Sequence, residues 1–272
     1  MIKVDKERCI GCELCVKDCP VKCISLVDGK AEVDNNKCIK CYHCIAICPK
    51  MAVATDEFSM NDVIEYDKDK FEINPENLLN FIKFRRSIRA FKAKEVEEEK
   101  LKKIVEAGRF TPTSGNSQDV RYVVVREGLE ELTEMVLESL NEKGQYVLND
   151  SNTADGIRRY AQMWVDMYKS YKESPAWEDR IYFNAPAVIC VIAEAPINGG
   201  LASTNMELMI NALGLGTFYS GFTVRAVQGN EKIRQFLGLK GEEQLITCMA
   251  VGYPAVKYAR TAPRKTAEIC WK

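Results

Sequence analysis

The chain has 272 residues with 38 basic and 39 acidic side chains, and this near-neutral balance argues against a nucleic-acid-binding protein. Its first residues lack the apolar core of a secretory signal. Its longest apolar stretch, residues 185–193, falls far short of the ~20 residues of a membrane-spanning helix. We therefore expect a cytoplasmic protein with no nucleic-acid or membrane partner. Twelve cysteines in such a chain favour metal ligation over disulfide bonds.

Two cysteine motifs dominate the first 56 residues. CIGCELCVKDCP starts at Cys9, and CIKCYHCIAICP starts 29 residues later at Cys38, which indicates an internal duplication. Between them, alternating apolar residues flank Asp28-Gly29, which predicts a β-hairpin. The short spacings let one loop aim three thiolates at one cluster, and the closing proline turns the fourth thiolate away. Structural zinc also uses paired C-x-x-C, but it needs neither the third nor the fourth cysteine of each duplicated motif.

The duplicated motif resembles the bacterial two-cluster ferredoxins, in which the fourth cysteine of each run ligates the other cluster. The resemblance covers residues 1–56 and implies two [4Fe–4S] clusters in a ferredoxin-like domain. It assigns one cluster to Cys9, Cys12, Cys15 and Cys48, and the other to Cys38, Cys41, Cys44 and Cys19.

Three further cysteines and the single histidine are expected to have no ligand role. Cys23 stands where the second repeat has Ala52, which predicts a small packing residue beside a cluster. Cys190 and Cys248 lie in the apolar runs AVICVIA and LITCMAV, so we expect buried, inert thiols. His43 is expected to be exposed, and a chain with one histidine so placed is a poor candidate for a Ser-His-Asp hydrolase.

Residues 57–77 are predicted to link the first domain to a second domain of residues 78–272. The segment is acidic and has no sustained periodicity. A helix should begin near Pro75, because Asn74 can cap it and proline suits its first turn. Three apolar side chains of that helix are expected to face the second domain, namely Leu78, Leu79 and Ile82.

Four stretches of the second domain are candidates for a cofactor site. RRSIR, residues 85–89, is either a solvated basic patch or a phosphate clamp, since guanidinium groups fit phosphate oxygens. A predicted helix at 96–109 leads into the polar turn PTSGNSQ and an apolar strand. GLGTFYSG follows a helix instead of a strand and lacks the third glycine of a dinucleotide fingerprint, so we predict no Rossmann site. VGYPAVKYARTAPRK lies near the end.

Together, these four stretches resemble the FMN-dependent nitroreductase family over residues 78–272. The resemblance implies an α+β fold and an intertwined homodimer with FMN at the subunit interface. It implies contacts to the FMN phosphate and ribityl chain from Arg85, Arg86, Ser87 and Arg89, with Arg264 closing on the same phosphate.

Two more segments gain a role from the same resemblance. Ser220 and Gly221 match the segment whose backbone N–H points at flavin N5, where a donor would support the negative charge that builds up during reduction. The polar turn matches a loop that reaches the flavin across the dimer interface, with contacts from Pro112, Thr113, Ser114, Asn116 and Gln118. Asp119 departs from the family, which commonly has proline there.

Residues 154–173 carry six apolar or aromatic side chains at helical spacing: Tyr160, Met163, Trp164, Met167, Tyr168 and Tyr171. This pattern is typical of a core or dimer-interface helix, and a lid over the flavin is the alternative. The runs VRYVVV, AVICVIA and LITCMAV predict at least three strands.

The combined resemblance implies an oxidoreductase that passes electrons from the clusters to FMN and on to a small acceptor. Nitroaromatics, quinones, activated alkenes and halogenated aromatics all fit, because the fold does not choose among them. The donor could be a ferredoxin-type protein or NAD(P)H. Two alternatives stay open: a non-catalytic electron-transfer or redox-sensing module that acts on a protein partner, and clusters that only hold residues 1–56 folded.

Overall fold

The computed structural model describes all 272 residues and divides into two units, which are described separately. The first unit contains residues 1–74 and 113–117, and the second contains residues 75–112 and 118–272. None of the helices combines the length and the apolar composition that crossing a membrane requires.

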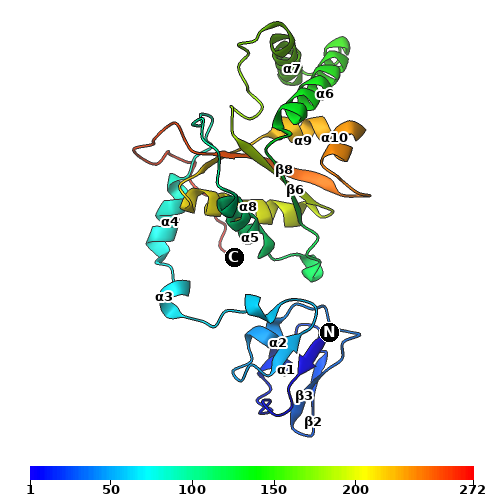
Figure 1. Cartoon of the computed structure of the whole chain (residues 1–272), viewed down its shortest axis with the longest axis vertical. Helices are drawn as coiled ribbons and strands as arrows, with labels where there is room; N and C mark the ends of the chain where they lie inside the picture. Colours follow the sequence, from blue (N-terminus) through cyan, green and yellow to red (C-terminus); the bar gives the residue numbers. More distant parts are fainter. The chain divides into compact units, whose positions relative to one another are not determined.

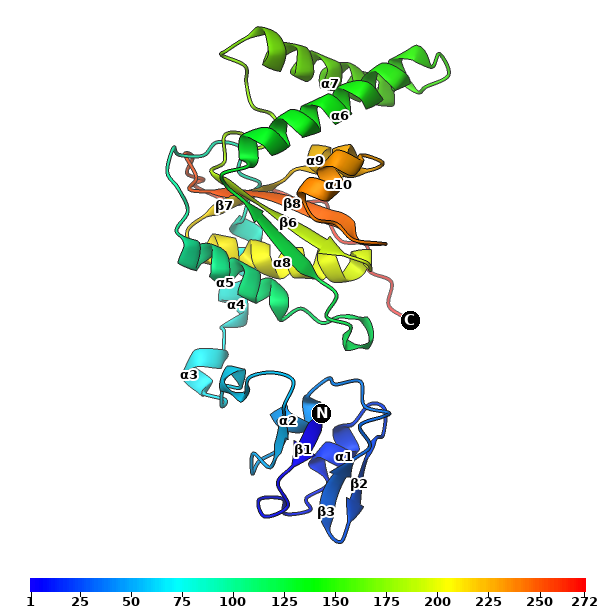
Figure 2. The same cartoon turned by 45° about the vertical axis from the view of Figure 1, so that its right-hand side comes forward.

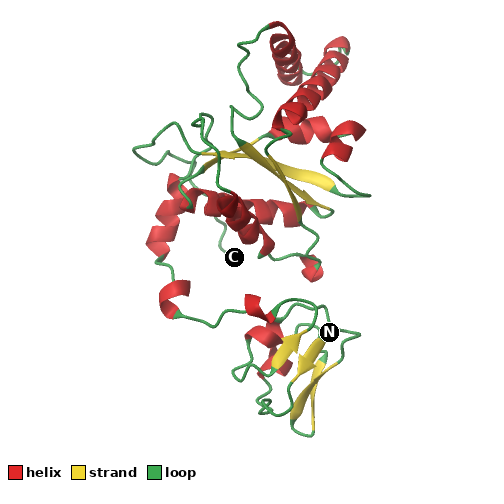
Figure 3. Ribbon diagram, viewed as in Figure 1, coloured by secondary structure: helices red, strands yellow, loops and turns green.

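The first unit holds two small sheets and short helices (Figure 1): β1 (Ile2–Val4), α1 (Leu14–Asp18), β2 (Ile24–Val27), β3 (Lys30–Val33), α2 (His43–Ala46), β4 (Val53–Thr55), η1 (Met60–Asp62), α3 (Lys68–Phe71) and η2 (Ser114–Asn116). β1 pairs antiparallel with β4, and β2 pairs antiparallel with β3 (Figure 3). The β2–β3 turn is the predicted hairpin, with φ of 50° at Asp28 and 74° at Gly29. Positive φ at both central residues is what a type I′ turn requires.

The duplication is visible in the backbone of the first unit. Three pairs of equivalent positions have left-handed φ in both copies, namely Gly11 with Lys40, Glu13 with Tyr42, and Lys22 with Met51. Five of these six residues carry a side chain, for which this conformation is unfavourable by about 1–3 kcal/mol each. The surrounding loops must therefore impose it.

The second unit is built on a four-stranded antiparallel sheet in the order β5-β6-β8-β7. Its elements are α4 (Pro75–Phe84), α5 (Glu98–Arg109), β5 (Arg121–Val125), α6 (Leu129–Asn149), α7 (Asp155–Glu173), β6 (Ala187–Ala193), α8 (Pro196–Ala212), β7 (Gly216–Tyr219), α9 (Gly221–Val227), α10 (Glu231–Phe236) and β8 (Gln244–Gly252). The predicted strands are therefore all present.

Helices cover both faces of this sheet (Figure 2). α5 and α8 lie on one face, α6, α9 and α10 lie on the other, and α7 packs on the outer side of α6. All seven residues of β6 are buried, because successive side chains point to opposite faces and both faces are covered. Cys190 packs on the α6 side, whereas Ile189 and Val191 pack on the α8 side.

Residues 85–92 extend the β7 edge of the sheet. Ser87 forms a parallel bridge to Thr217, and the Ile88 N–H donates to the Thr217 carbonyl at 2.9 Å. Gly216 permits this close approach, since a Cβ there would lie 2.3 Å from Ile88 Cγ1. The segment thus runs directly beside the strand that leads to α9.

Two helix predictions have different outcomes. The core interpretation of α7 is confirmed, because Trp164 and Met167 are buried in the cluster that α6 shares with the sheet, whereas Tyr160 is 50% exposed. The expectation that three apolar side chains of α4 face the second domain is wrong within one chain. Leu78, Leu79 and Ile82 are 40, 42 and 40% exposed. α4 buries no residue, because no other element of the second unit covers its apolar side.

Candidate metal centres and cofactor site

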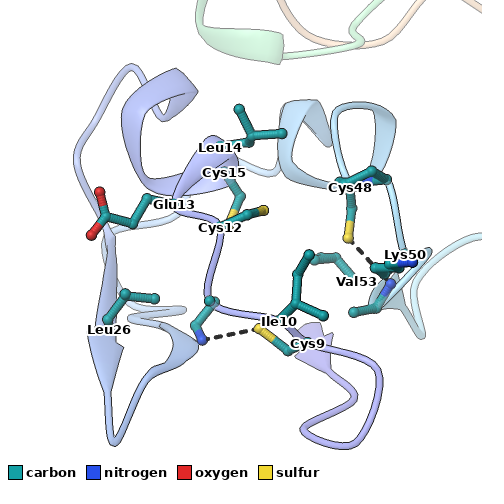
Figure 4. Close-up of a pocket in the computed structure, with 14 residues that line it drawn as sticks. Cys9, Ile10, Cys12, Glu13, Leu14, Cys15, Leu26, Cys48, Lys50 and Val53 are labelled. Carbon is teal, nitrogen blue, oxygen red and sulfur yellow. Dashed lines mark hydrogen bonds between the residues drawn. The ribbon is translucent and has the colours of Figure 1, made fainter.

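Four cysteines of the first unit line one cavity. Cys9, Cys12 and Cys15 come from the first motif, and Cys48 comes from the second. Figure 4 shows Cys48 across the hollow from the other three sulfurs. Pro49 also lines the cavity, at the point where the chain turns out of the second motif.

A second cavity is the counterpart of the first, lined by Cys38, Cys41 and Cys44 together with Cys19 and Cys23. The structure therefore brings together both four-cysteine sets, each with its fourth member from the other motif. Cys23 joins the second set as a fifth sulfur. No equivalent of it exists in the first cavity, where the corresponding residue is Ala52.

The chemistry of the two cysteine sets fits iron–sulfur clusters. Each set places four thiols from two motifs around one cavity. All-thiolate ligation with this crossed pattern is what a pair of four-iron clusters requires.

Backbone N–H groups are directed at the ligand sulfurs. The Ala31 N–H donates to Cys9 Sγ at 3.4 Å, and the Ala52 N–H donates to Cys48 Sγ at 3.3 Å. In the second cavity the Lys40 N–H donates to Cys38 Sγ at 3.4 Å. The bond from Ala31 is the main cause that lowers the pKa of Cys9, because a donor favours the charged thiolate.

The other two residues near the clusters behave as expected. Cys23 is 6% exposed, and burial raises the pKa of its thiol to about 12, with a smaller contribution from its contact with Cys19. His43 has an exposed side chain whose Nδ1 lies 3.3 Å from a carboxylate oxygen of Asp18. The burial of Cys23 beside the second cysteine set and the exposure of His43 agree with the sequence analysis, and the absence of a ligand role for either residue stays a prediction.

In the second unit, the basic stretch divides into arginines with different surroundings. The Arg85 guanidinium forms an ion pair of 2.6 Å with Glu207 on α8, and Glu207 is 6% exposed. Tyr219 OH donates to the Ser203 carbonyl and lies 3.4 Å from the same carboxylate. Burial, and secondarily the charge of Glu207, raises the pKa of Tyr219. Arg85 therefore balances a buried charge.

The neighbours of Arg85 are differently placed. The Arg89 guanidinium is exposed and lies over the ring of Phe218, 4.6 Å from its centre. Ser87 is exposed at the β7 edge, and Arg86 is half-buried. These three groups stay available to a ligand at this edge, whereas Arg85 is already paired.

The Ser220–Gly221 segment follows β7 directly, next to residues 85–89. The Ser220 N–H donates to the Cys248 carbonyl at 2.8 Å, and its hydroxyl lies 3.0 Å from Thr223 Oγ1. Thr223 in turn donates to Tyr182 OH at 3.0 Å, and both Ser220 and Thr223 are buried. Ser220 is thus occupied within the core, whereas Gly221 is exposed and is the first residue of α9, where a backbone N–H has no partner inside the helix.

The remaining candidate residues are divided between the two units. Thr113, Ser114 and Asn116 belong with the first unit, while Pro112 and Gln118 belong with the second. Arg264 lies in the exposed tail after β8.

Asp119, which departs from the family pattern, has a structural use in the second unit. Its carboxylate accepts from the Ala195 N–H at 3.2 Å and from Asn198 Nδ2 at 2.7 Å, at the start of α8. Sequence reasoning missed this cap and also missed Glu207. A lone acid in the apolar run MELMINA is the only signal that could have indicated a buried charge at residue 207.

Comparison with known proteins identifies both parts of the chain. Residues 82–253 match the model of the Nitroreductase family, and residues 1–49 match the model of a 4Fe-4S dicluster domain. The chain is 23% identical over 186 residues to iodotyrosine deiodinase from Hydra vulgaris, which covers 63% of this chain and 62% of that protein. It is 23% identical over 189 residues to a provisionally named NADH dehydrogenase/NAD(P)H nitroreductase from Archaeoglobus fulgidus, with 66% and 86% covered. The chain thus spans less than two thirds of the length of the first relative.

Solved structures show the same fold. A nitroreductase with bound FMN from Bacteroides fragilis aligns with a TM-score of 0.51 and 22% identity, over 73% of this chain and 100% of that one. A second, from Desulfitobacterium hafniense and also with bound FMN, aligns with a TM-score of 0.53 and 20% identity over the same shares.

Proposed function

Because the chain belongs to the nitroreductase family and carries a 4Fe-4S dicluster domain at its N-terminus, we propose that it is an FMN-dependent oxidoreductase that passes electrons from two [4Fe–4S] clusters to FMN and on to a small acceptor. One observation carries this proposal. Two complete four-cysteine cavities and a nitroreductase domain occur in the same chain.

The β7 edge supplies groups that fit FMN. Arg86 and Arg89 are available for the phosphate, for which guanidinium donors are well suited, and Ser87 adds a hydroxyl beside them. The backbone N–H of Gly221, at the start of α9, is the proposed donor to flavin N5, where a donor supports charge that builds up on reduction. Two fold neighbours bind FMN, which supports the same assignment.

The proposal includes a homodimer. Within one chain the turn residues 113–117 do not belong with the second unit, and Arg264 lies in an exposed tail. We infer that the turn residues reach the flavin of a second copy, as the resemblance to the family implies. The exposed apolar side of α4, with Leu78, Leu79 and Ile82, is available to the same partner.

The two cofactors supply complementary chemistry. FMN, if held at the β7 edge, would accept electrons singly from a cluster and supply two to an acceptor, and clusters of low potential would make the first transfer downhill. The chain's own contribution is to hold both groups and to present a donor at N5.

The acceptor belongs to one of four classes: nitroaromatics, quinones, activated alkenes and halogenated aromatics. Similarity to an NAD(P)H nitroreductase favours nitroaromatics. Similarity to iodotyrosine deiodinase supports halogenated aromatics as a second candidate class. A ferredoxin-type protein or NAD(P)H is the proposed electron donor.

Rapid anaerobic mixing tests the electron path. With a low-potential ferredoxin-type donor, the full chain should show cluster reduction before flavin reduction. A chain that begins at Asn74 should keep FMN, because the second unit has its own core, but its flavin should be reduced more slowly by that donor. Any reduction by NAD(P)H, which acts at the flavin, should be the same in both chains.

Two results would contradict the proposal. Equal rates from the ferredoxin-type donor in both chains would show that the clusters are not the entry route. Flavin that is reoxidised only by a protein partner, and by no member of the four acceptor classes, would favour a non-catalytic electron-transfer module instead.

A further inference from the structure

The two cluster cavities differ in one buried side chain. The loops after Cys19 and Cys48 are equivalent in the duplication, and each returns a backbone N–H to its cysteine. The Cys23 N–H donates to Cys19 Sγ at 3.4 Å, and the Ala52 N–H donates to Cys48 Sγ at 3.3 Å. In both loops the residue before the donor has left-handed φ. The backbone is therefore the same, and only the donor's side chain changes from a thiol to a methyl group.

The Cys23 thiol lies against a ligand sulfur. Its Sγ is 3.6 Å from Cys19 Sγ, its side chain is 6% exposed, and it lines the cavity that the second cysteine set surrounds. Distance alone does not tell which sulfur donates the hydrogen bond. A cysteine that ligates iron is a thiolate and has no proton, so Cys23 is the donor and Cys19 the acceptor at 3.6 Å; Cys38 of the same cysteine set is a second neighbour of the Cys23 thiol.

Such a bond changes the energy of cluster reduction. Hydrogen bonds to the sulfurs are among the factors that set the potential of an iron–sulfur cluster, because a donor stabilises the more negative, reduced form. We propose that Cys23 is a positioning residue, not a ligand, whose S–H bond to Cys19 raises the reduction potential of the cluster held by Cys19, Cys38, Cys41 and Cys44 and leaves the other cluster unchanged. This inference rests on the cluster part of the proposed function and is independent of its flavin part.

The duplication provides a matched control. Ala52 is 2% exposed, lines the first cavity and occupies the position that Cys23 has in the second. Ala52→Cys should therefore give the first cluster the donor that it lacks, while Cys23→Ala should remove it from the second cluster. Cys23→Ser keeps a hydroxyl donor and should preserve part of the effect.

The test is an anaerobic redox titration of the full-length protein, followed by electron paramagnetic resonance, with iron and acid-labile sulfide measured for each variant. Cys23→Ala should shift one reduction wave to lower potential, and Cys23→Ser should shift the same wave less. Ala52→Cys should shift the other wave to higher potential. If the two wild-type waves coincide, either variant should split them. If Ala52→Cys does not assemble both clusters, the two Cys23 variants carry the test alone.

Three outcomes would overturn the inference. The first is unchanged midpoints in Cys23→Ala, and the second is an equal shift of both waves in that variant. The third is loss of about four of the roughly eight iron atoms in Cys23→Ala, which would make Cys23 a ligand. Two wild-type waves without these shifts would leave the proposed function intact. The absence of any iron–sulfur signal would defeat both.

Discussion

Arg85 and Arg89 lie in one basic stretch, yet their guanidinium groups have opposite surroundings. Arg85 is paired at 2.6 Å with Glu207, whose side chain is 8% exposed, whereas Arg89 is exposed over the ring of Phe218. A buried carboxylate without its cation is costly, so the two arginines should respond differently to the same substitution.

We expect Arg85→Ala to lower the free energy of unfolding by about 2–4 kcal/mol, because it leaves Glu207 charged and unpaired in the core. Arg85 is one-third exposed, which keeps the loss below that of a fully buried pair. The double variant Arg85→Ala/Glu207→Gln should recover much of it. Chemical denaturation of the isolated second unit and of the full chain measures the effect.

Arg89→Ala is the matched control for that experiment. It should change stability little and should weaken FMN binding by about 1.5–3 kcal/mol if the arginine contacts the phosphate. Riboflavin, which has no phosphate, should bind the variant and the wild type alike. The reverse pattern, with stable Arg85→Ala protein and unaffected FMN binding in Arg89→Ala, would contradict both assignments.

At the scale of elements, residues 85–92 depend on a close approach to β7. Gly216 has no side chain, and a Cβ at that position would lie 2.3 Å from Ile88 Cγ1 and 3.0 Å from Pro254 Cγ. Ile88 is held by its N–H bond to the Thr217 carbonyl, and Ala255, which follows Pro254, donates its N–H to the Ala90 carbonyl at 2.9 Å. This contact therefore fixes the position of the side chains that we propose to bind the FMN phosphate, namely Arg86, Ser87 and Arg89.

Gly216→Ala should push the segment away from β7 and cost about 1–3 kcal/mol of stability, as overpacking does. FMN binding should weaken at the same time, because the arginines move with the segment. Gly200→Ala, inside α8 with no atom within 4 Å of the new Cβ, should be neutral or slightly stabilising. Thermal unfolding and flavin titration report both effects, and an unaffected Gly216→Ala variant would refute the packing argument.

The duplicated loops of the first unit are coupled through their fourth cysteines. Cys19 lines the cavity of the second motif, and Cys48 lines that of the first. Cys19→Ser should therefore perturb the cluster of Cys38, Cys41 and Cys44, and Cys48→Ser should perturb the other one. Iron analysis and the redox titration of each variant decide this. A Cys19→Ser effect confined to the cluster of Cys9 would exclude the crossed arrangement.

At the scale of the whole molecule, the two units have different sources of stability. The second unit buries two apolar clusters on the two faces of its sheet. The first unit buries a small cluster that includes ligand cysteines, and it keeps five side-chain-bearing residues at unfavourable φ around the two cavities. Its fold should therefore depend on metal.

Removal of iron with a chelator under anaerobic conditions should unfold residues 1–56 and leave the second unit folded. Hydrogen exchange resolves the two parts, because backbone protection should be lost in β1–β4 and retained in β6 and β8. Retained protection throughout the first unit after complete loss of iron would show that its polypeptide core suffices. The same measurement on the chain that begins at Asn74 is the control.

What the sequence by itself determined is local chemistry. Cysteine spacing identified the two-cluster domain, Asp28-Gly29 identified its hairpin, and four short motifs in order identified the nitroreductase domain. Each of these signals lies within a few residues, where backbone geometry limits the choices. The apolar runs identified β5, β6 and β8 for the same reason, since a strand buried on one or both faces must be apolar.

Only the tertiary structure decided which distant side chains meet. Arg85 and Glu207 are 122 residues apart, and Asp119 and Asn198 are 79 apart, so no local pattern links either pair. The exposure of Leu78 on α4 also depends on what the fold leaves uncovered. The partners of a charge, and the side of a helix that is buried, are set by packing over the whole chain. For this reason, the sequence alone shows neither that Arg85 pairs with Glu207 while Arg89 stays exposed nor that Cys23 contacts Cys19.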